Sequence, residues 1–362
     1  MPRNNSHDYK ALFVNDTPLL DTRAPIEFNQ GAFPLSQNIP LMTDDERAAV
    51  GTCYKQQGQS KAIRLGHQLV NGAVKAQRVA QWQRFCNSNP DGYLYCFRGG
   101  MRSQITQQWL KEVGIDYPFI TGGYKALRRY LIDNIEIGAA MPSVVIGGNT
   151  GCGKTDLIKS LQNGIDIEGA AHHRGSSFGQ YVTQQRTQIN FENQLAIQIV
   201  KKLENRCQRF VFEDEGKTIG CASLPTAIRN AINQSDMVVI ADSLDVRLER
   251  LIDEYIVKMQ REHIQRFGEE LGWTKFSDYL AQGLFKIRRR LGLERYASLV
   301  QIQQNAIDIM QSSGTITQHA DWLVPLLEQY YDPMYEYQLN KKSARIIFKG
   351  SHKEVAQWLE PT

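Results

Sequence analysis

The sequence lacks the features of a membrane or secreted protein. None of its apolar runs approaches the length of a membrane span, because glycine, aspartate or arginine soon interrupts each one. The first eight residues, MPRNNSHD, are polar and do not resemble a signal peptide. Cysteine is scarce: there are six, with no Cys-x-x-Cys pair, which argues against both a disulfide framework and a zinc site. We therefore expect a cytoplasmic protein.

A strong excess of charge of either sign is also absent. The formal net charge is +4 and charged residues make up 22% of the chain, so binding to nucleic acid is permitted but not required. Hydrophobic residues make up 42%, which is enough for well-packed cores. A length of 362 residues favours two domains over one.

Strand-like and helix-like segments alternate along the chain, with buried strands predicted at 93–95, 118–120, 144–146, 210–212 and 237–240. Such alternation is typical of an α/β fold whose parallel sheets are covered by helices. Glycine and proline interrupt the pattern at 138–142, so we predict domains at residues 10–135 and 141–260. Residues 261–362 are predicted to be mainly helical and packed on the second domain, with a late strand at 344–348.

The first chemical centre is the loop Cys96-Phe97-Arg98-Gly99-Gly100-Met101-Arg102-Ser103, which lies between a predicted strand and a predicted helix. Backbone N–H groups in such a loop converge on the sulfur, and nearby arginines should lower the thiol pKa. We predict that Cys96 is a nucleophile that handles sulfur or selenium, in an anion cradle formed by Arg98, Gly99, Gly100, Arg102 and Ser103. On the loop alone, a buried cysteine at the end of a strand is an equal alternative.

The second chemical centre, Gly148-Asn149-Thr150-Gly151-Cys152-Gly153-Lys154-Thr155, fits the Walker A pattern between a strand and a helix. Backbone N–H groups would surround a diphosphate, Lys154 would neutralise it, and the Thr155 hydroxyl could ligate Mg²⁺. The predicted diphosphate-binding residues are Gly148, Gly151, Gly153, Lys154 and Thr155. No tightly bound cofactor is expected.

Two further groups of polar residues follow the Walker A loop. Glu215 comes just after the strand at 210–212, where a carboxylate could hold a metal ion or activate water. A strand-terminating acidic turn is an equally good interpretation of Glu215. His173, Arg174 and Ser176 lie in a glycine-containing stretch and could contact an anionic substrate. A metal site at these residues is not expected, because no partner ligands occur at a suitable spacing.

Several motifs carry a resemblance to known families. Residues 21–28 (DTRAPIEF), 31–34 (GAFP) and 38–41 (NIPL), together with 96–103, resemble a rhodanese domain over residues 10–135. This resemblance argues against the buried-cysteine alternative for Cys96. The rhodanese-like part followed by a P-loop NTPase-like part is similar to the bacterial tRNA 2-selenouridine synthases. The motifs that extend this likeness over nearly the whole chain are GTCYK (51–55), LGH (65–67), GGYKALR (122–128), HRGSSFG (173–179) and FEN (191–193).

The resemblance implies a reaction at the wobble uridine of tRNA that already carries a 2-thio group. Members of that family attach a geranyl group from geranyl diphosphate to the sulfur, and selenium from selenophosphate then replaces the geranylated sulfur. Cys96 matches the family's catalytic cysteine, for which a selanyl-cysteine intermediate is proposed, whereas Cys53 has a structural role. The implied partners are the anticodon arm of tRNA and the enzyme that supplies selenophosphate. We expect a monomer.

Two other functions compete with this interpretation. One is an ATP-coupled rhodanese-type sulfurtransferase acting on tRNA, with a persulfide on Cys96 and the P-loop activating an acceptor. The other is a protein without enzymatic activity that only binds tRNA or nucleotide. The intact Walker A pattern and the presence of Cys96 argue against the second of these.

Overall fold

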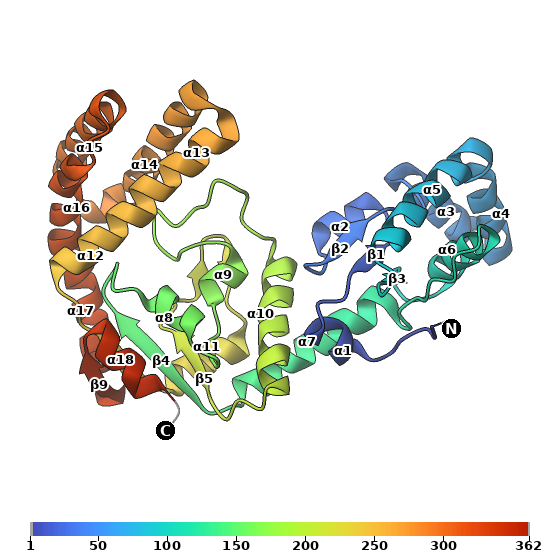
Figure 1. The fold of residues 1–362 in the computed structure, drawn as a ribbon, viewed down its shortest axis with the longest axis horizontal. Coiled ribbons are helices and arrows are strands. Elements are labelled where there is room, and N and C mark those ends of the chain that lie inside the picture. Colours follow the sequence, from blue (N-terminus) through green and yellow to red (C-terminus); the bar gives the residue numbers. More distant parts are fainter. Residues whose placement is uncertain (1–2, 361–362) are drawn as a thin grey trace. The chain divides into compact units, whose positions relative to one another are not determined.

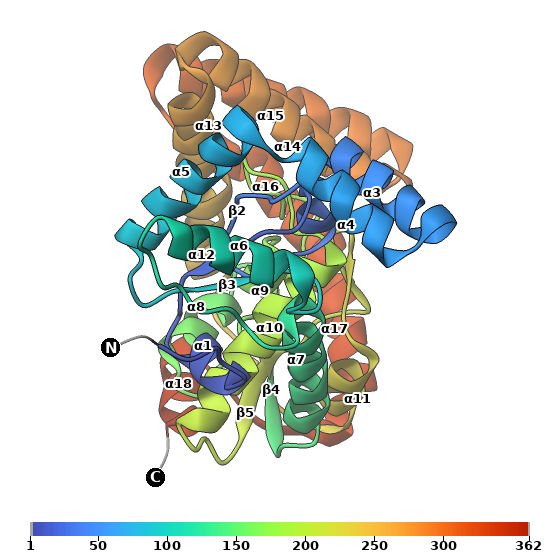
Figure 2. The same ribbon diagram turned by 90° about the vertical axis from the view of Figure 1, so that its right-hand side faces the viewer.

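The structure is a computed structural model that describes residues 3–360. The chain divides into two compact units (Figures 1 and 2). The first unit comprises residues up to Ile137 together with Thr187–Asn205, and the second comprises Gly138–Arg186 and the residues from Arg206 onward. No helix among residues 3–360 has the combined length and apolarity that crossing a membrane requires.

The first unit is built on a parallel three-stranded sheet in the order β2-β1-β3. The strands are β1 (Leu19–Asp21), β2 (Ser36–Asn38) and β3 (Tyr93–Tyr95). The helices around them are α1 (Tyr9–Val14), α2 (Pro25–Gln30), α3 (Asp44–Gln57), α4 (Gln59–Leu69), α5 (Gly72–Ser88), α6 (Met101–Glu112) and α7 (Gly123–Ala139). Leu20 and Leu94 from the sheet pack in one core with Trp82 of α5 and Leu110 of α6. The predicted strand at 93–95 is confirmed.

The predicted strand at 118–120 is wrong as a full strand. Phe119 and Ile120 form only isolated bridges, to Leu94 and Ser6 respectively. The chain turns immediately afterwards, where Gly122 adopts a left-handed conformation with φ of +78°. This turn ends the pairing after two residues and leads directly into α7.

Helix α10 (Gln188–Glu204) belongs to the first unit, although it follows the Walker A loop in sequence. Its Asn190 Oδ1 accepts a 2.8 Å hydrogen bond from the Ala32 amide, and Asn193 Nδ2 donates one of 2.8 Å to the Ala32 carbonyl. Arg128 Nη1 also donates to Asn193 Oδ1 at 2.9 Å. The predicted continuous domain at 141–260 is therefore corrected, because residues 187–205 find their polar and apolar partners in the first unit.

The second unit contains a parallel four-stranded sheet in the order β5-β4-β8-β9. Its strands are β4 (Ser143–Gly148), β5 (Phe210–Glu213), β8 (Asp236–Ile240) and β9 (Ile346–Gly350), and a small hairpin is formed by β6 (Thr218–Ile219) and β7 (Ala222–Ser223). The helices next to the sheet in sequence are α8 (Lys154–Ser160), α9 (Ile167–Ala171), α11 (Thr226–Gln234), α12 (Leu244–Leu251) and α18 (His352–Leu359). The predicted strands at 144–146, 210–212 and 237–240 are confirmed, and the late strand begins two residues later than predicted.

Most of the remaining helices of the second unit pack with one another, whereas α17 (Asp332–Lys341) lies beside β4 of the sheet (Figure 1). The remaining helices are η1 (Ile252–Lys258), α13 (Met259–Phe267), α14 (Glu269–Leu291), α15 (Leu293–Ser313), η2 (Thr317–His319), α16 (Ala320–Leu326), η3 (Leu327–Tyr331), α17 and η4 (Ser343–Arg345). Phe178, from the loop after α9, is buried in their core beside Trp322. Its carbonyl accepts a 2.7 Å hydrogen bond from the Tyr279 hydroxyl. A Cβ atom at Gly283 would lie 2.2 Å from the Phe178 ring, so α14 can pack here only with a glycine.

Candidate active sites

Cys96 directly follows β3, and hydrogen bonds from two other segments fix the backbone of Tyr95 and Cys96. The Tyr95 carbonyl accepts hydrogen bonds of 2.9 Å from both the amide and the hydroxyl of Thr22. The Cys96 carbonyl accepts one of 2.9 Å from the Tyr124 amide. Cys96 itself is buried, with 3% of its surface exposed. The cysteine is therefore fixed in place before any substrate arrives.

Gly99 makes the tight turn of the Cys96 loop possible. Its φ is +62°, and a Cβ atom there would lie 2.6 Å from the Ile120 carbonyl oxygen and 2.7 Å from the Gly122 nitrogen. Gly123, in the turn before α7, packs against the Cys96 loop in the same way: a Cβ atom at Gly123 would lie only 2.3 Å from the Cys96 carbonyl oxygen. The loop and the turn before α7 thus pack backbone against backbone, which only glycine allows at these positions.

The charges around the Cys96 loop differ from the predicted cradle in one respect. Arg102 donates hydrogen bonds of 2.7 and 3.2 Å to the two carboxylate oxygens of Glu27, and Arg47 lies 3.0 Å from the same carboxylate. Burial opposes ionisation of Glu27, but Arg102 and Arg47 hold its pKa below the ordinary value. Because Arg102 is already paired, the exposed Arg98 is the cradle arginine that remains available for an anion.

Ser103 and the Asp21–Arg23 pair complete the surroundings of this loop. Ser103 is fully buried, and its hydroxyl has no hydrogen-bond partner among the described residues. Asp21 and Arg23 are buried and joined by a bond of 2.6 Å between Asp21 Oδ2 and Arg23 Nη2. The Arg23 guanidinium also lies 3.8 Å from the centre of the Tyr124 ring. The pair therefore ties β1 to the first turn of α7 and has a structural role.

The Walker A loop follows β4 and leads into α8. Its three glycines, Gly148, Gly151 and Gly153, all have positive φ, of +143°, +81° and +82°. Lys154 Nζ donates to the Gly148 carbonyl at 3.0 Å and to the Asn149 carbonyl at 3.4 Å. Burial disfavours its charge, yet Cys152, Tyr335 and the nearby carboxylates raise the Lys154 pKa above its usual value. Lys154 therefore stays protonated, which suits it to neutralise a diphosphate.

Three carboxylates gather beside this loop. One oxygen each of Glu168, Glu213 and Glu215 can be chosen so that all lie within 4.8 Å of one another. Thr155 Oγ1 donates a 2.8 Å hydrogen bond to Glu168 Oε2. Both Glu213 oxygens are buried without a hydrogen-bond partner among the described residues. Oxygen ligands at this spacing could hold a divalent cation such as Mg²⁺.

Electrostatic repulsion within this cluster shows in the pKa directions. Burial and the neighbouring Glu168 raise the pKa of Glu215 to about 8, against the opposing effect of Lys154. Burial and the other two carboxylates also raise the pKa of Glu213 well above its ordinary value. Burial and mutual repulsion thus favour the protonated forms of these carboxyl groups, and a bound cation would replace those protons.

Of these carboxylates, only Glu215 had been predicted to have a role. Glu168 lies 13 residues beyond Thr155 on the short helix α9, and no recognised motif marks it. Glu213 is the last residue of β5 and pairs in register with Ile146 of β4, so its place at the carboxyl end of the strand was the available signal. Asp214 between them turns away and bonds to Lys342 at 2.6 Å.

A polar cavity of about 550 Å³ brings several predicted residues together. Lys154, Thr155, Glu215, Arg174 and Ser176 all line it. Arg174 Cζ lies 4.1 Å from the centre of the Tyr181 ring, and its Nε lies 3.7 Å from Glu254. This cavity can therefore hold a phosphate-containing ligand between the Walker A loop and the arginine.

His173 does not line this cavity and does not provide a charge. Burial, together with Lys286 and Arg174, lowers the pKa of His173 to about 4, so the ring is neutral near pH 7. Its Nδ1 accepts a hydrogen bond of 3.2 Å from the Gly175 amide. A contact between His173 and an anion therefore stays a prediction, in which a neutral ring would take part, while Nδ1 helps to shape the loop that carries Arg174.

His173 instead lines a second cavity of the same unit, of about 990 Å³, which shares Gly175, Ser176 and Tyr335 with the first. Both aromatic and basic side chains line it, among them Tyr181, Phe267, Tyr330, Arg266, Lys286 and Arg290. His172 stacks on the Tyr181 ring with centroids 4.4 Å apart. Aromatic faces with cations between them are the surroundings that unstacked nucleobases prefer.

Comparisons with known proteins match the chain over its full length. The family model described as "tRNA 2-selenouridine synthase AAA domain" matches residues 141–362. A tRNA 2-selenouridine synthase of Photobacterium profundum is 60% identical over 359 residues, which are 99% of each chain. That of Serratia proteamaculans is 55% identical over 99% of this chain and 96% of the relative. That of Salmonella paratyphi A is 51% identical over 99% of both.

Proposed function

The chain belongs to the tRNA 2-selenouridine synthase family. We propose that it converts 2-thiouridine at the wobble position of tRNA to 2-selenouridine in two steps, the first at the Walker A loop and the second at the Cys96 loop. In the first step the uridine sulfur attacks the first carbon of geranyl diphosphate. A carbon–sulfur bond forms, the carbon–oxygen bond breaks, and diphosphate leaves with the electron pair. In the second step selenium replaces the geranylated sulfur.

The observation that carries the first step is the position of half-buried Lys154 on the Walker A loop, where it lines the polar cavity. Charge develops on the diphosphate as the carbon–oxygen bond breaks, and a fixed cation with oriented N–H groups stabilises it most at that moment. The attacking sulfur is a soft nucleophile, so the step needs no strong base from the protein. Arg174 lines the same cavity and adds a second positive charge.

The second step belongs to the Cys96 loop of the rhodanese-like first unit. A bond forms between selenium and C2 of the base, the bond between C2 and sulfur breaks, and geranylthiolate leaves and takes up a proton. Water cleaves the phosphorus–selenium bond, so that selenophosphate ends as phosphate. Loop N–H groups, the N-terminus of α6 and Arg98 stabilise the negative charge on the chalcogen at Cys96.

The carboxylate cluster fits Mg²⁺ as a cofactor of the first step. Glu213 would provide two oxygens that have no hydrogen-bond partner among residues 3–360, and Glu168, Glu215 and the Thr155 hydroxyl would provide the other hard ligands. When bound, the ion would neutralise part of the diphosphate charge. The three carboxylates would hold it, and Lys154 would face the diphosphate from the Walker A loop.

We assign the anticodon arm of tRNA to the aromatic and basic cavity of the second unit. Lys286 and Arg290 of α14 would contact phosphates, and Tyr330 would offer a face for an unstacked base. Since this cavity shares residues with the polar cavity, a wobble base bound there would lie close to the diphosphate.

The function is tested with purified protein, geranyl diphosphate, selenophosphate and an anticodon stem-loop that carries 2-thiouridine. Nucleoside mass spectrometry should detect S-geranyl-2-thiouridine first and 2-selenouridine later, with release of diphosphate and geranylthiol. Omission of selenophosphate should stop the reaction at the geranylated nucleoside. Formation of 2-selenouridine without geranyl diphosphate, at the same rate, would contradict the two-step route.

A further inference from the structure

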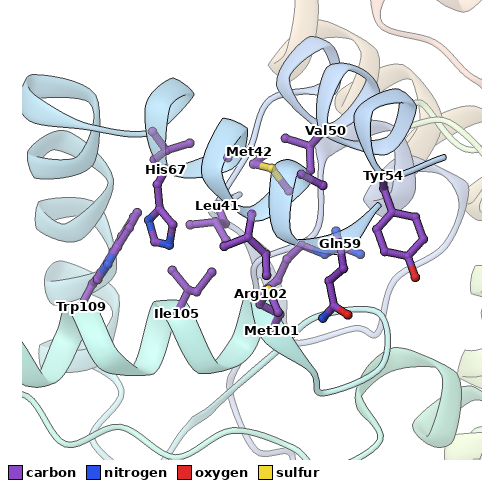
Figure 3. A pocket seen from close by; sticks show the side chains of 14 residues that line it. Leu41, Met42, Val50, Tyr54, Gln59, His67, Met101, Arg102, Ile105 and Trp109 are labelled. Carbon is purple, nitrogen blue, oxygen red and sulfur yellow. The ribbon is translucent and has the colours of Figure 1, made fainter. Parts of the chain in front are cut away.

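The first unit contains an apolar cavity of about 250 Å³ that has no assigned ligand in the two proposed steps. It lies between α6 on one side and α3 and α4 on the other, and Figure 3 shows the side chains that line it. Val50, Ala62, Ile105 and Trp109 are among them. Its polar residues are few, and one of them, Arg102, directs its charge to Glu27. The interior therefore offers hydrocarbon contacts and almost no hydrogen bonds.

The cavity begins where the Cys96 loop ends. The Gly100 carbonyl oxygen lies 4.0 Å from Cys96 Sγ, and the next two residues, Met101 and Arg102, line the cavity. In Figure 3 Met101 lies at one end of the row of α6 side chains and Trp109 at the other, with Ile105 between them. At a rise of roughly 1.5 Å per residue the row extends about 12 Å. A linear group that starts near the sulfur can thus lie along α6.

The lining excludes most ligands of this enzyme family's chemistry. A phosphate, a ribose or the polar edge of a base would lose its hydrogen bonds to water in the cavity and find few replacements. A hydrocarbon chain loses none. An apolar cavity of about 150 Å³ takes the six carbons of benzene, so in proportion the volume of about 250 Å³ fits roughly ten carbons. A geranyl group is a branched chain of that size.

We propose that this cavity binds the geranyl group of S-geranyl-2-thiouridine while C2 of the base lies at Cys96, an inference that rests on the proposed two-step function. The hydrocarbon would anchor the base through the exchange of sulfur for selenium, and it would leave as geranylthiol. Plain 2-thiouridine has no group for the cavity. The first unit would therefore select the geranylated base over its precursor.

The test changes the length of the cavity and reads out the preferred chain length. Stem-loops with S-dimethylallyl, S-geranyl or S-farnesyl 2-thiouridine are supplied with selenophosphate, and kcat/KM for selenation is measured. Ala62→Leu shortens the cavity and should lower kcat/KM for the geranyl substrate by about tenfold or more, with a smaller effect on dimethylallyl. Ile105→Ala enlarges it and should favour farnesyl. Ala76→Leu, on the exposed side of α5, is the matched control and should keep the wild-type profile.

The outcomes separate this inference from the function on which it rests. Wild-type protein that cannot selenate any S-alkyl stem-loop would overturn the two-step function. Wild-type protein that selenates them, with the same chain-length profile in folded Ala62→Leu and Ile105→Ala, would overturn the assignment of the cavity. Geranylation of plain 2-thiouridine should be unchanged in both variants, and an equal loss in that reaction would also contradict the assignment. Thermal unfolding verifies that each variant is folded.

Discussion

The Thr155 hydroxyl donates a 2.8 Å hydrogen bond to Glu168, which links the end of the Walker A loop to a carboxylate on α9. In the Walker A pattern this hydroxyl serves as a ligand of Mg²⁺. Without an ion it bonds to the acid that would share that ion. The pKa of Glu168 is raised by burial, with Thr155 and Lys154 acting in the opposite direction. Binding of a cation would therefore replace a protonated, hydrogen-bonded arrangement of Thr155 and Glu168 with one in which both are ligands of the ion.

This relationship predicts a pH-dependent effect of Mg²⁺. The folded-state pKa of Glu215, about 8, lies above the ordinary value of 4.5, so its stabilising contribution is full below pH 4.5 and is lost as the pH rises through 8. Mg²⁺ replaces the proton and should raise the thermal midpoint more at pH 8.5 than at pH 6.5. Differential scanning calorimetry at both pH values, with and without Mg²⁺, measures this. Glu215→Gln should remove most of the effect, whereas Glu294→Gln on exposed α15 should not.

The two centres predict a partition between the half-reactions. Cys96→Ser should abolish selenation of an S-geranyl stem-loop but keep its formation from geranyl diphosphate, because the Walker A loop does not involve the thiol. Lys154→Ala should slow geranylation by about a hundredfold or more, as expected when one preorganised charge on a leaving group is lost. Mass spectrometry of each half-reaction separates the two effects.

Cys207→Ser is the control for the cysteine variant, since Cys207 is a free cysteine that lines neither cavity of the second unit. Its half-reactions should match those of the wild type. Equal loss of both half-reactions in Cys96→Ser, with an unchanged thermal midpoint, would contradict the partition.

Local sequence patterns predict several elements of this fold, but not the partners against which they pack. The strands that precede Cys96 and Gly148 were found because a short apolar run and a glycine-rich loop lie next to each other in sequence. The membership of α10 in the first unit was missed, because an amphipathic pattern says that a helix is buried but not against which core. Glu168 was missed for a related reason, since only folding brings it to Thr155.

The pair of Asp21 and Arg23 predicts a large loss of stability when one partner is removed. Both side chains are almost fully buried, so Arg23→Ala leaves an uncompensated carboxylate and should cost about 3–5 kcal/mol. Urea denaturation of the variant and the wild type measures this difference in the free energy of unfolding. Arg129→Ala removes an exposed pair with Asp133 on α7 and should cost about 0.5 kcal/mol or less. Similar losses in the two variants would show that burial of the Asp21–Arg23 pair does not set its contribution.

The backbone contact at Gly99 predicts that one methyl group is enough to disturb the Cys96 centre. In Gly99→Ala the added Cβ would meet the Ile120 carbonyl oxygen at 2.6 Å, so the loop must move away from the turn before α7. Selenation should fall by about tenfold or more, because a displacement of roughly 1 Å at a reacting group can cost that much, while geranylation should persist.

Gly114→Ala is the matched control: its φ of +82° is equally left-handed, but its Cβ would meet nothing within 4 Å. Both variants carry the conformational cost of a left-handed alanine, so a loss of selenation confined to Gly99→Ala identifies the contact with the turn, and not backbone strain, as what holds Cys96 in place. An equal loss in the two variants would instead place the effect in the backbone conformation alone.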